Sequence, residues 1–184
     1  MCDISAAGLG GSAFKGYDYF MVSAVTIANR FIELAKRDRI PLTNMQLQKL
    51  VYIAHGWALA LLGQPLIKDL VEAWQYGPVI PSLYHNLSKY GAGTVDEPIP
   101  FLGGGKLTPN EEALIESVWK SYGQMSGFKL STITHQENTP WSRAVKFSGL
   151  RSVIPDRFIA EHYRQLYDER IRRKREPANP RRAN

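Results

Sequence analysis

Cysteine, long apolar runs and metal-ligand spacing are what this sequence lacks. Its 184 residues include one cysteine, Cys2, which excludes an intramolecular disulfide and a zinc site built from cysteines. No apolar run approaches the roughly 18 residues that a membrane span needs, and no secretory signal peptide is recognisable. We therefore expect a cytoplasmic protein, in a reducing compartment, with no membrane contact.

Basic charge is in excess, but the excess lies at one end of the chain. The formal net charge is +6. Residues 170–184 hold seven basic side chains and one acidic, so residues 1–169 hold 16 of each sign and are formally neutral. A domain that binds phosphates usually carries its basic excess on the folded face. A solvated C-terminus is therefore the preferred interpretation of this tail, and phosphate binding by Arg170 to Arg182 is the alternative.

Length and composition indicate one globular domain between two tails. Hydrophobic residues make up 44% of the chain and charged residues 22%, which is typical of globular proteins. Residues 1–21 are rich in glycine and small side chains without a sustained period, which predicts a flexible leader. We expect a helical domain over residues 22–169 and a basic tail over residues 170–184.

Apolar residues recur at helical spacing through most of this domain. Thr43-Asn44-Met45-Gln46 has the form of a capping box. The helix that follows, residues 44–62, is apolar on nearly every side near its end, which predicts the central helix of the core. Between this helix and Pro81 we expect a short extended stretch and a tight turn at Gly77-Pro78. The fold class is a mainly α, single-domain bundle of six or seven helices with at most short β segments.

No constellation of catalytic residues stands out. The four histidines, at positions 55, 85, 135 and 162, share no metal-ligand spacing. We interpret His55 as a packed structural side chain, and His135 as closing a short helix or orienting a hydrogen bond. Phosphate-binding loops and nucleophile elbows are not recognisable. We therefore expect no enzyme activity, cofactor or metal. The disfavoured alternative is a hydrolase, for which His55, Glu72 and His135 would have to meet in the fold.

Two aromatic residues flank the predicted turn. Trp74 and Tyr76 next to Gly77-Pro78 form either a plug in the core or an anchor for a partner, because buried aromatic side chains contribute strongly to both. The structural interpretation is preferred, with Glu72 bonded to a backbone group or to Lys49.

The same segments resemble the signature of a known family, the Panacea domain of GepA-like phage-associated proteins and SocA-type antitoxins. The first is Leu47-Gln48-Lys49-Leu50-Val51-Tyr52-Ile53-Ala54-His55-Gly56-Trp57, and the second runs from Glu72-Ala73-Trp74-Gln75-Tyr76-Gly77-Pro78 to Tyr84. The later Leu130-Ser131, Thr134-His135 and Pro140-Trp141 also match, and the similarity covers about residues 22 to 168. The resemblance implies a set of signature residues whose role is mostly structural. They are Lys49, Leu50, Tyr52, Trp57, Glu72, Trp74, Tyr76, Gly77, Pro78, Pro81, Tyr84, His135 and Trp141.

The resemblance also implies a function and partners. It implies an antitoxin of a toxin–antitoxin pair that neutralises a cognate protein toxin by direct binding, with toxin-binding residues unassigned. The SocA-type case further implies a proteolytic adaptor that delivers its toxin to the ClpXP protease. A nucleic-acid-binding regulator that uses the basic C-terminal tail is the alternative, and nucleic acid is the less favoured partner.

Overall fold

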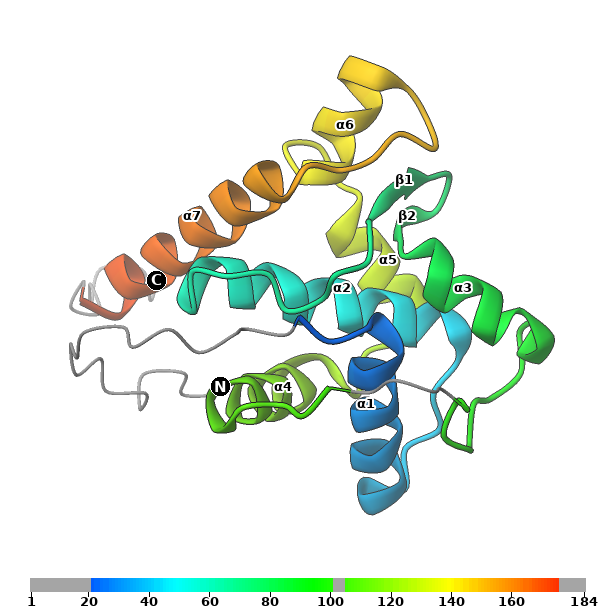
Figure 1. The fold of residues 1–184 in the computed structure, drawn as a ribbon. Helices are drawn as coiled ribbons and strands as arrows, with labels where there is room; N and C mark the ends of the chain where they lie inside the picture. The colour runs from blue at the N-terminus through cyan, green and yellow to red at the C-terminus, as the bar shows by residue number, and fades with distance from the viewer. Residues whose placement is uncertain (1–20, 101–104, 176–184) are drawn as a thin grey trace, which may run out of the picture.

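Seven α-helices, a 3-10 turn and a two-stranded hairpin make up the part of the chain that the structure describes, residues 21–100 and 105–175 (Figure 1). This computed structural model confirms the mainly α fold class. The predicted leader lies outside the described residues except for Met21, as do residues 176–184 of the tail. The elements are, in order, α1 (Ala24–Asp38), α2 (Asn44–Leu61), β1 (Glu72–Trp74), β2 (Gly77–Val79), α3 (Pro81–Leu87), η1 (Ser88–Tyr90), α4 (Pro109–Tyr122), α5 (Gly127–Thr134), α6 (Pro140–Ser148) and α7 (Asp156–Arg175).

The predicted central helix, α2, crosses the middle of the molecule (Figure 1). Its capping box forms: the Thr43 hydroxyl accepts from the Gln46 backbone N–H at 3.3 Å, and Gln46 Oε1 accepts from the Thr43 N–H at 3.0 Å. These bonds satisfy two donors that a helix start otherwise leaves free. Fifteen of the 18 residues of α2 are buried, because α1, α4, α5, α7 and the hairpin pack around it.

Polar contacts tie α1 to its neighbours. The indole N–H of Trp119 in α4 donates to Asp38 Oδ2 at 2.6 Å, and Arg30 donates to Glu112 at 2.7 Å. At the start of α1, Asp69 accepts from the Ala24 N–H at 2.7 Å and also from the Ser82 hydroxyl of α3. One carboxylate thereby joins α1 to α3.

The predicted extended stretch and turn form an antiparallel hairpin. Its register pairs Glu72 with Val79 and Trp74 with Gly77. A distant segment, residues 151–154, runs along the other edge of β1, where the Ala73 N–H donates to the Ser152 carbonyl at 2.9 Å and the Arg151 N–H donates to the Ala73 carbonyl at 2.7 Å. This third line of backbone pairing was not predicted from the sequence.

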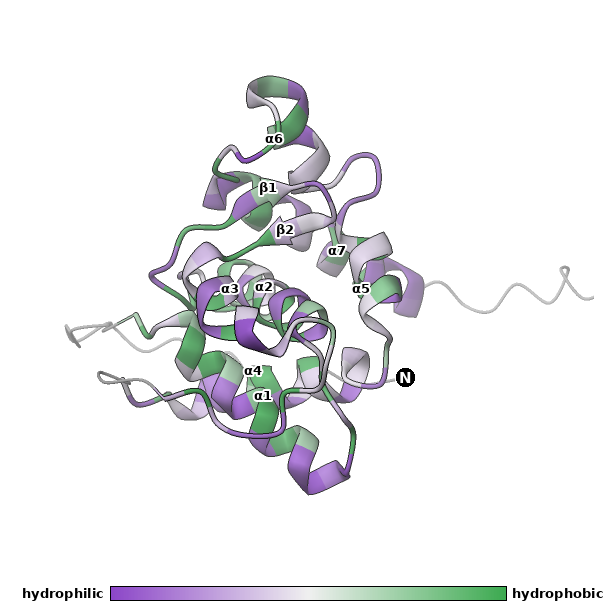
Figure 2. Ribbon diagram, turned by 90° about the vertical axis from the view of Figure 1, so that its right-hand side faces the viewer, coloured by the Kyte–Doolittle hydropathy of each residue, from purple (hydrophilic) through white to green (hydrophobic). Residues whose placement is uncertain are grey.

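α7 lies against α2, and α6 contacts both α7 and the hairpin. The contact between α2 and α7 is close, since a Cβ added at Gly56 would stand 2.3 Å from the Tyr163 ring. Figure 2 places α6 and the hairpin at one end of the molecule and α1 at the other. Within the described ranges, none of the helices combines the length and apolar character required to cross a membrane.

Candidate partner-binding surface

Lys49 of α2 lies beneath the hairpin. The residue is 2% exposed, and its amine Nζ donates to the carbonyl oxygen of Pro78 at 2.9 Å. Across residues 21–100 and 105–175, no carboxylate lies within ion-pair distance of it. Burial lowers the pKa of Lys49 to about 7, because lost hydration disfavours the charged form. The amine is therefore partly neutral near pH 7.

Gly77 allows the hairpin to approach Lys49. Its φ of +101° is a conformation that side-chain-bearing residues rarely adopt, and an added Cβ would lie 3.2 Å from Lys49 Cε and 3.5 Å from His135 Cβ. Glycine is required here both for the backbone conformation and for the close approach.

Side chains of α5 and α6 hold the backbone of the turn. The Ser131 hydroxyl donates to the Tyr76 carbonyl at 2.8 Å, and the Trp141 indole N–H donates to the Trp74 carbonyl at 2.8 Å. The His135 ring packs edge-on against Trp141, with centroids 5.3 Å apart. These bonds fix the turn on the helical body through groups far apart in the sequence.

Glu72 does not bond as expected. Its Oε2 accepts from the indole N–H of Trp74 at 2.8 Å, so the expectation of a bond to the backbone or to Lys49 is wrong. Residues two apart on a strand share a face, which brings these two side chains together.

The outer face of the hairpin carries aromatic rings. Tyr76 is 64% exposed, so its side chain is no core plug even though its carbonyl is tied to α5. Trp74 is half-buried, and its ring lies 5.0 Å from the partly exposed ring of Tyr84. The guanidinium of Arg151 lies 4.9 Å from the Trp74 centroid. The hairpin thus presents a rigid, partly aromatic surface.

The match to known proteins covers Lys49, the hairpin, Ser131, His135 and Trp141. Residues 47–142 match the family described as antitoxin SocA-like, Panacea domain. The chain belongs to this family. It is also 32% identical over 155 residues to antitoxin SocA of Caulobacter vibrioides, covering 74% of this chain and 82% of that relative. No solved structure matches the chain. The Panacea-domain resemblance seen in the two segments is confirmed.

The remaining signature residues lie away from the hairpin's outer face. Leu50 is in the core, and Pro81 begins α3. The rings of Tyr52 and Trp57 meet Tyr163 of α7 edge-on at 6.2 and 5.2 Å. The first Panacea segment therefore contacts the hairpin through Lys49 and α7 through its aromatic residues.

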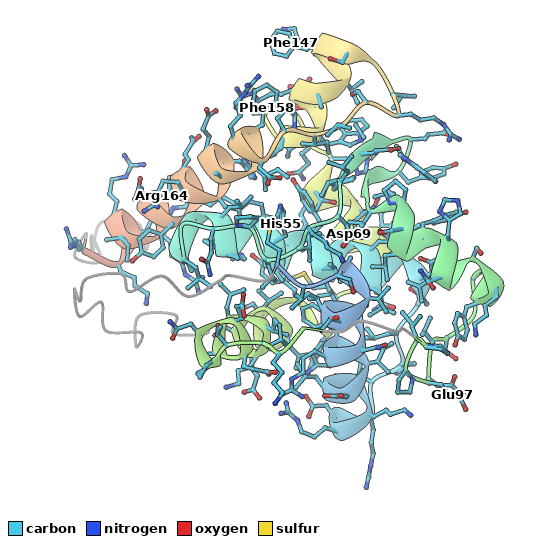
Figure 3. The ribbon with its side chains drawn as sticks, in the orientation of Figure 1. His55, Asp69, Glu97, Phe147, Phe158 and Arg164 are labelled. Carbon is cyan, nitrogen blue, oxygen red and sulfur yellow. The ribbon has the colours of Figure 1, made fainter. Side chains whose placement is uncertain are left out.

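The candidate catalytic residues do not share a polar group. His55 is buried on α2, with Nε2 3.1 Å from Asp156 Oδ1 at the start of α7 (Figure 3). Glu72 bonds Trp74, and His135 Nδ1 lies 2.5 Å from the Ser131 carbonyl oxygen. Within the described residues, no three or more His, Cys, Asp or Glu side chains are grouped so that they could hold a metal.

Two polar contacts of the hairpin were not identified from the sequence. Gln48 Oε1 accepts from the Ile80 N–H at 2.8 Å, and Ser131 binds the Tyr76 carbonyl. Both residues stand within or beside the matched segments. Their polar side chains between apolar neighbours were the available signal, but their partners are 32 and 55 residues away.

Proposed function

We propose that this protein is an antitoxin that neutralises a cognate protein toxin by binding it directly. The supporting observation is its membership of the SocA-like antitoxin family together with the use that the fold makes of the signature residues. Lys49, Ser131 and Trp141 direct their polar groups at hairpin carbonyls, while Tyr76 faces outward. Such a surface is built for contact with another macromolecule, since rigid aromatic residues are common anchors in protein interfaces.

The proposed mechanism needs no catalytic step. His55, Glu72 and His135 each bond a different residue, whereas acid–base or nucleophilic catalysis requires the reacting groups to converge. Neutralisation then follows from occupancy: the antitoxin covers the surface through which the toxin acts.

A direct test uses the protein encoded by the neighbouring gene as the candidate toxin. Expressed alone, that protein should stop growth, and co-expression with this chain should restore it. The two purified proteins should elute together in gel filtration. Toxicity that co-expression leaves unchanged, or separate elution of the two proteins, would count against the proposed function.

Delivery of the toxin to the ClpXP protease is the finer part of the proposal and follows from the family resemblance. It predicts that the toxin is degraded faster in cells that contain both this chain and ClpX than in cells that lack either one. A toxin half-life that is the same in all three strains would leave binding without delivery as the mechanism.

A further inference from the structure

Large apolar side chains are exposed around the end of α6. Phe147 is 73% exposed, and Leu150 and Val153 are also exposed. Figure 3 shows Phe147 projecting from the end of α6, with Phe158 near the start of α7. The two phenyl centroids lie 6.4 Å apart. An apolar cluster of this kind on a folded domain typically marks an interaction site.

A groove of about 370 Å³ lies between α6 and α7. Ala144, Phe147, Val153 and the ring of Phe158 give it apolar walls, and Arg157 stands at its edge. This volume is in the range that admits a small ligand or a few side chains of a partner.

Several basic side chains near the groove lie over aromatic rings. The guanidinium of Arg143 lies 3.9 Å and that of Arg157 lies 5.2 Å from the Phe158 centroid, and Arg151 stacks on Trp74. Lys146 is exposed on α6. Stacking of this type orders a guanidinium before any partner arrives.

The carboxylates near the groove are already engaged. Asp156 bonds His55, and Glu161 pairs with Arg143 at 2.7 Å. No ion pair within the described ranges includes Lys146, Arg151 or Arg157. Arg157 lines the groove, and Lys146 and Arg151 stand one and two residues from the lining residues Phe147 and Val153. Three basic side chains without an ion pair in the described ranges therefore adjoin the groove, on a domain that is formally neutral over residues 1–169.

We propose that this groove binds the toxin through a protein segment in which an apolar side chain is flanked by carboxylates. The proposal rests on the antitoxin function above and names the face and the chemistry of the contact. The apolar side chain enters between Phe147 and Phe158, and the carboxylates pair with Arg151 and Arg157. Because both guanidinium groups are already stacked, less conformational entropy is lost on binding.

An acidic protein segment fits this surface better than a nucleic acid does. Phe147 is a single exposed ring beside the aliphatic Leu150 and Val153, which bury apolar protein groups but give no further flat surface for stacking successive bases. A phosphate backbone is followed by a row of cations, whereas here one lining cation, Arg157, stands at the edge of apolar walls. This arrangement matches the apolar core and charged rim of a protein interface.

The test measures the dissociation constant for the purified product of the neighbouring gene. Phe147→Ala should weaken binding about tenfold, and the double variant Arg151→Glu, Arg157→Glu about a hundredfold, because it replaces attraction by repulsion. Binding by the wild type should also weaken as salt is raised. All three side chains in the test are exposed, so circular dichroism and thermal unfolding should match the wild type.

Matched controls are available on other faces. Phe128 on α5 is 82% exposed, and Arg164 is exposed on α7 away from Phe147 (Figure 3). Phe128→Ala and Arg164→Glu should change the dissociation constant by less than about twofold.

Three outcomes overturn the proposal, and they differ in whether the antitoxin function is rejected with it. Wild-type binding that none of the groove variants weakens rejects this face and leaves the antitoxin function standing. Failure of the wild type to bind rejects both. In the third outcome, the charge-reversal variant binds the toxin as the wild type does, but it no longer binds a mixed-sequence single-stranded oligonucleotide that the wild type binds. That result assigns the groove to nucleic acid.

Discussion

At the scale of single residues, a buried amine makes the stability of this protein depend on pH. Lys49 has a folded-state pKa of about 7, against an ordinary value of 10.5. Between these values the unfolded chain keeps a proton that the folded chain releases, so raising the pH through this window stabilises the folded state. Burial raises the pKa of Tyr52 and Tyr163, so these two groups lower the free energy of unfolding only when the pH rises above their ordinary value of 10.0, which is beyond the range from about pH 7 to 9.

Replacing Lys49 by methionine tests this directly. From pH 7 to pH 9 the free energy of unfolding of the wild type should rise by about 2 kcal/mol from this amine alone. Lys49→Met should lack that rise, whatever the loss of the Pro78 hydrogen bond does to its absolute stability. Urea unfolding at three pH values gives the comparison. Parallel pH profiles for the two proteins would show that the amine is charged when buried.

The contact between Gly77 and Lys49 can be separated from backbone strain. Gly77→Ala introduces both a positive-φ penalty and a Cβ close to the Lys49 side chain. Gly63→Ala introduces only the first, because Gly63 has φ of +71° and open space around it. We expect Gly77→Ala to lower the free energy of unfolding by about 2 to 3 kcal/mol and Gly63→Ala by about 1 kcal/mol. If chemical denaturation gives the same loss of unfolding free energy for both variants, the close approach of Gly77 to Lys49 has no role in stability.

At the scale of secondary-structure elements, local signals were predictable and distant pairings were not. The capping box at Thr43 forms as the sequence indicates. The pairing of residues 151–154 with β1 is invisible locally, because it joins backbone groups almost 80 residues apart. Likewise, nothing near Lys49 in the sequence names the Pro78 carbonyl as its acceptor. The family resemblance located these residues but did not supply their contacts.

The packing of α2 on α7 depends on a missing side chain. A methyl group at Gly56 would overlap the buried ring of Tyr163, so Gly56→Ala should destabilise the protein by about 2 to 3 kcal/mol. Tyr163→Leu shortens the opposing side chain, and the double variant should lose less stability than the two single losses added together. Thermal and urea unfolding of all four proteins complete the cycle. Simple additivity would mean that the two residues do not meet.

At the scale of the whole molecule, charge and binding surface are separated. The basic end of α7 and the nine residues after it carry the net charge, whereas the aromatic groove and hairpin lie on a formally neutral domain. The order of the charged residues along the sequence was enough to locate the charge. The exposed surface around Phe147 needed coordinates, because a phenylalanine at helical spacing reads from the sequence as core.

Removing residues 170–184 should therefore leave toxin binding within about twofold of the wild type, since the proposed contact at α6 and the start of α7 does not include them. The dissociation constant and the growth rescue give two readouts of the same deletion. The regulator alternative predicts instead that a salt-sensitive shift of promoter DNA disappears with these residues. A tenfold loss of toxin affinity would place part of the interface in the tail.

The central claim is that this protein acts by binding a toxin through its surface, and calorimetric titration of the neighbouring gene product into the purified protein tests it most directly. We predict a saturable complex with a dissociation constant below about 1 µM, formed without any added cofactor. The account would be contradicted if the protein protected cells from the toxin although the titration gave no heat and no complex formed. A toxin found covalently altered after mixing would also contradict it.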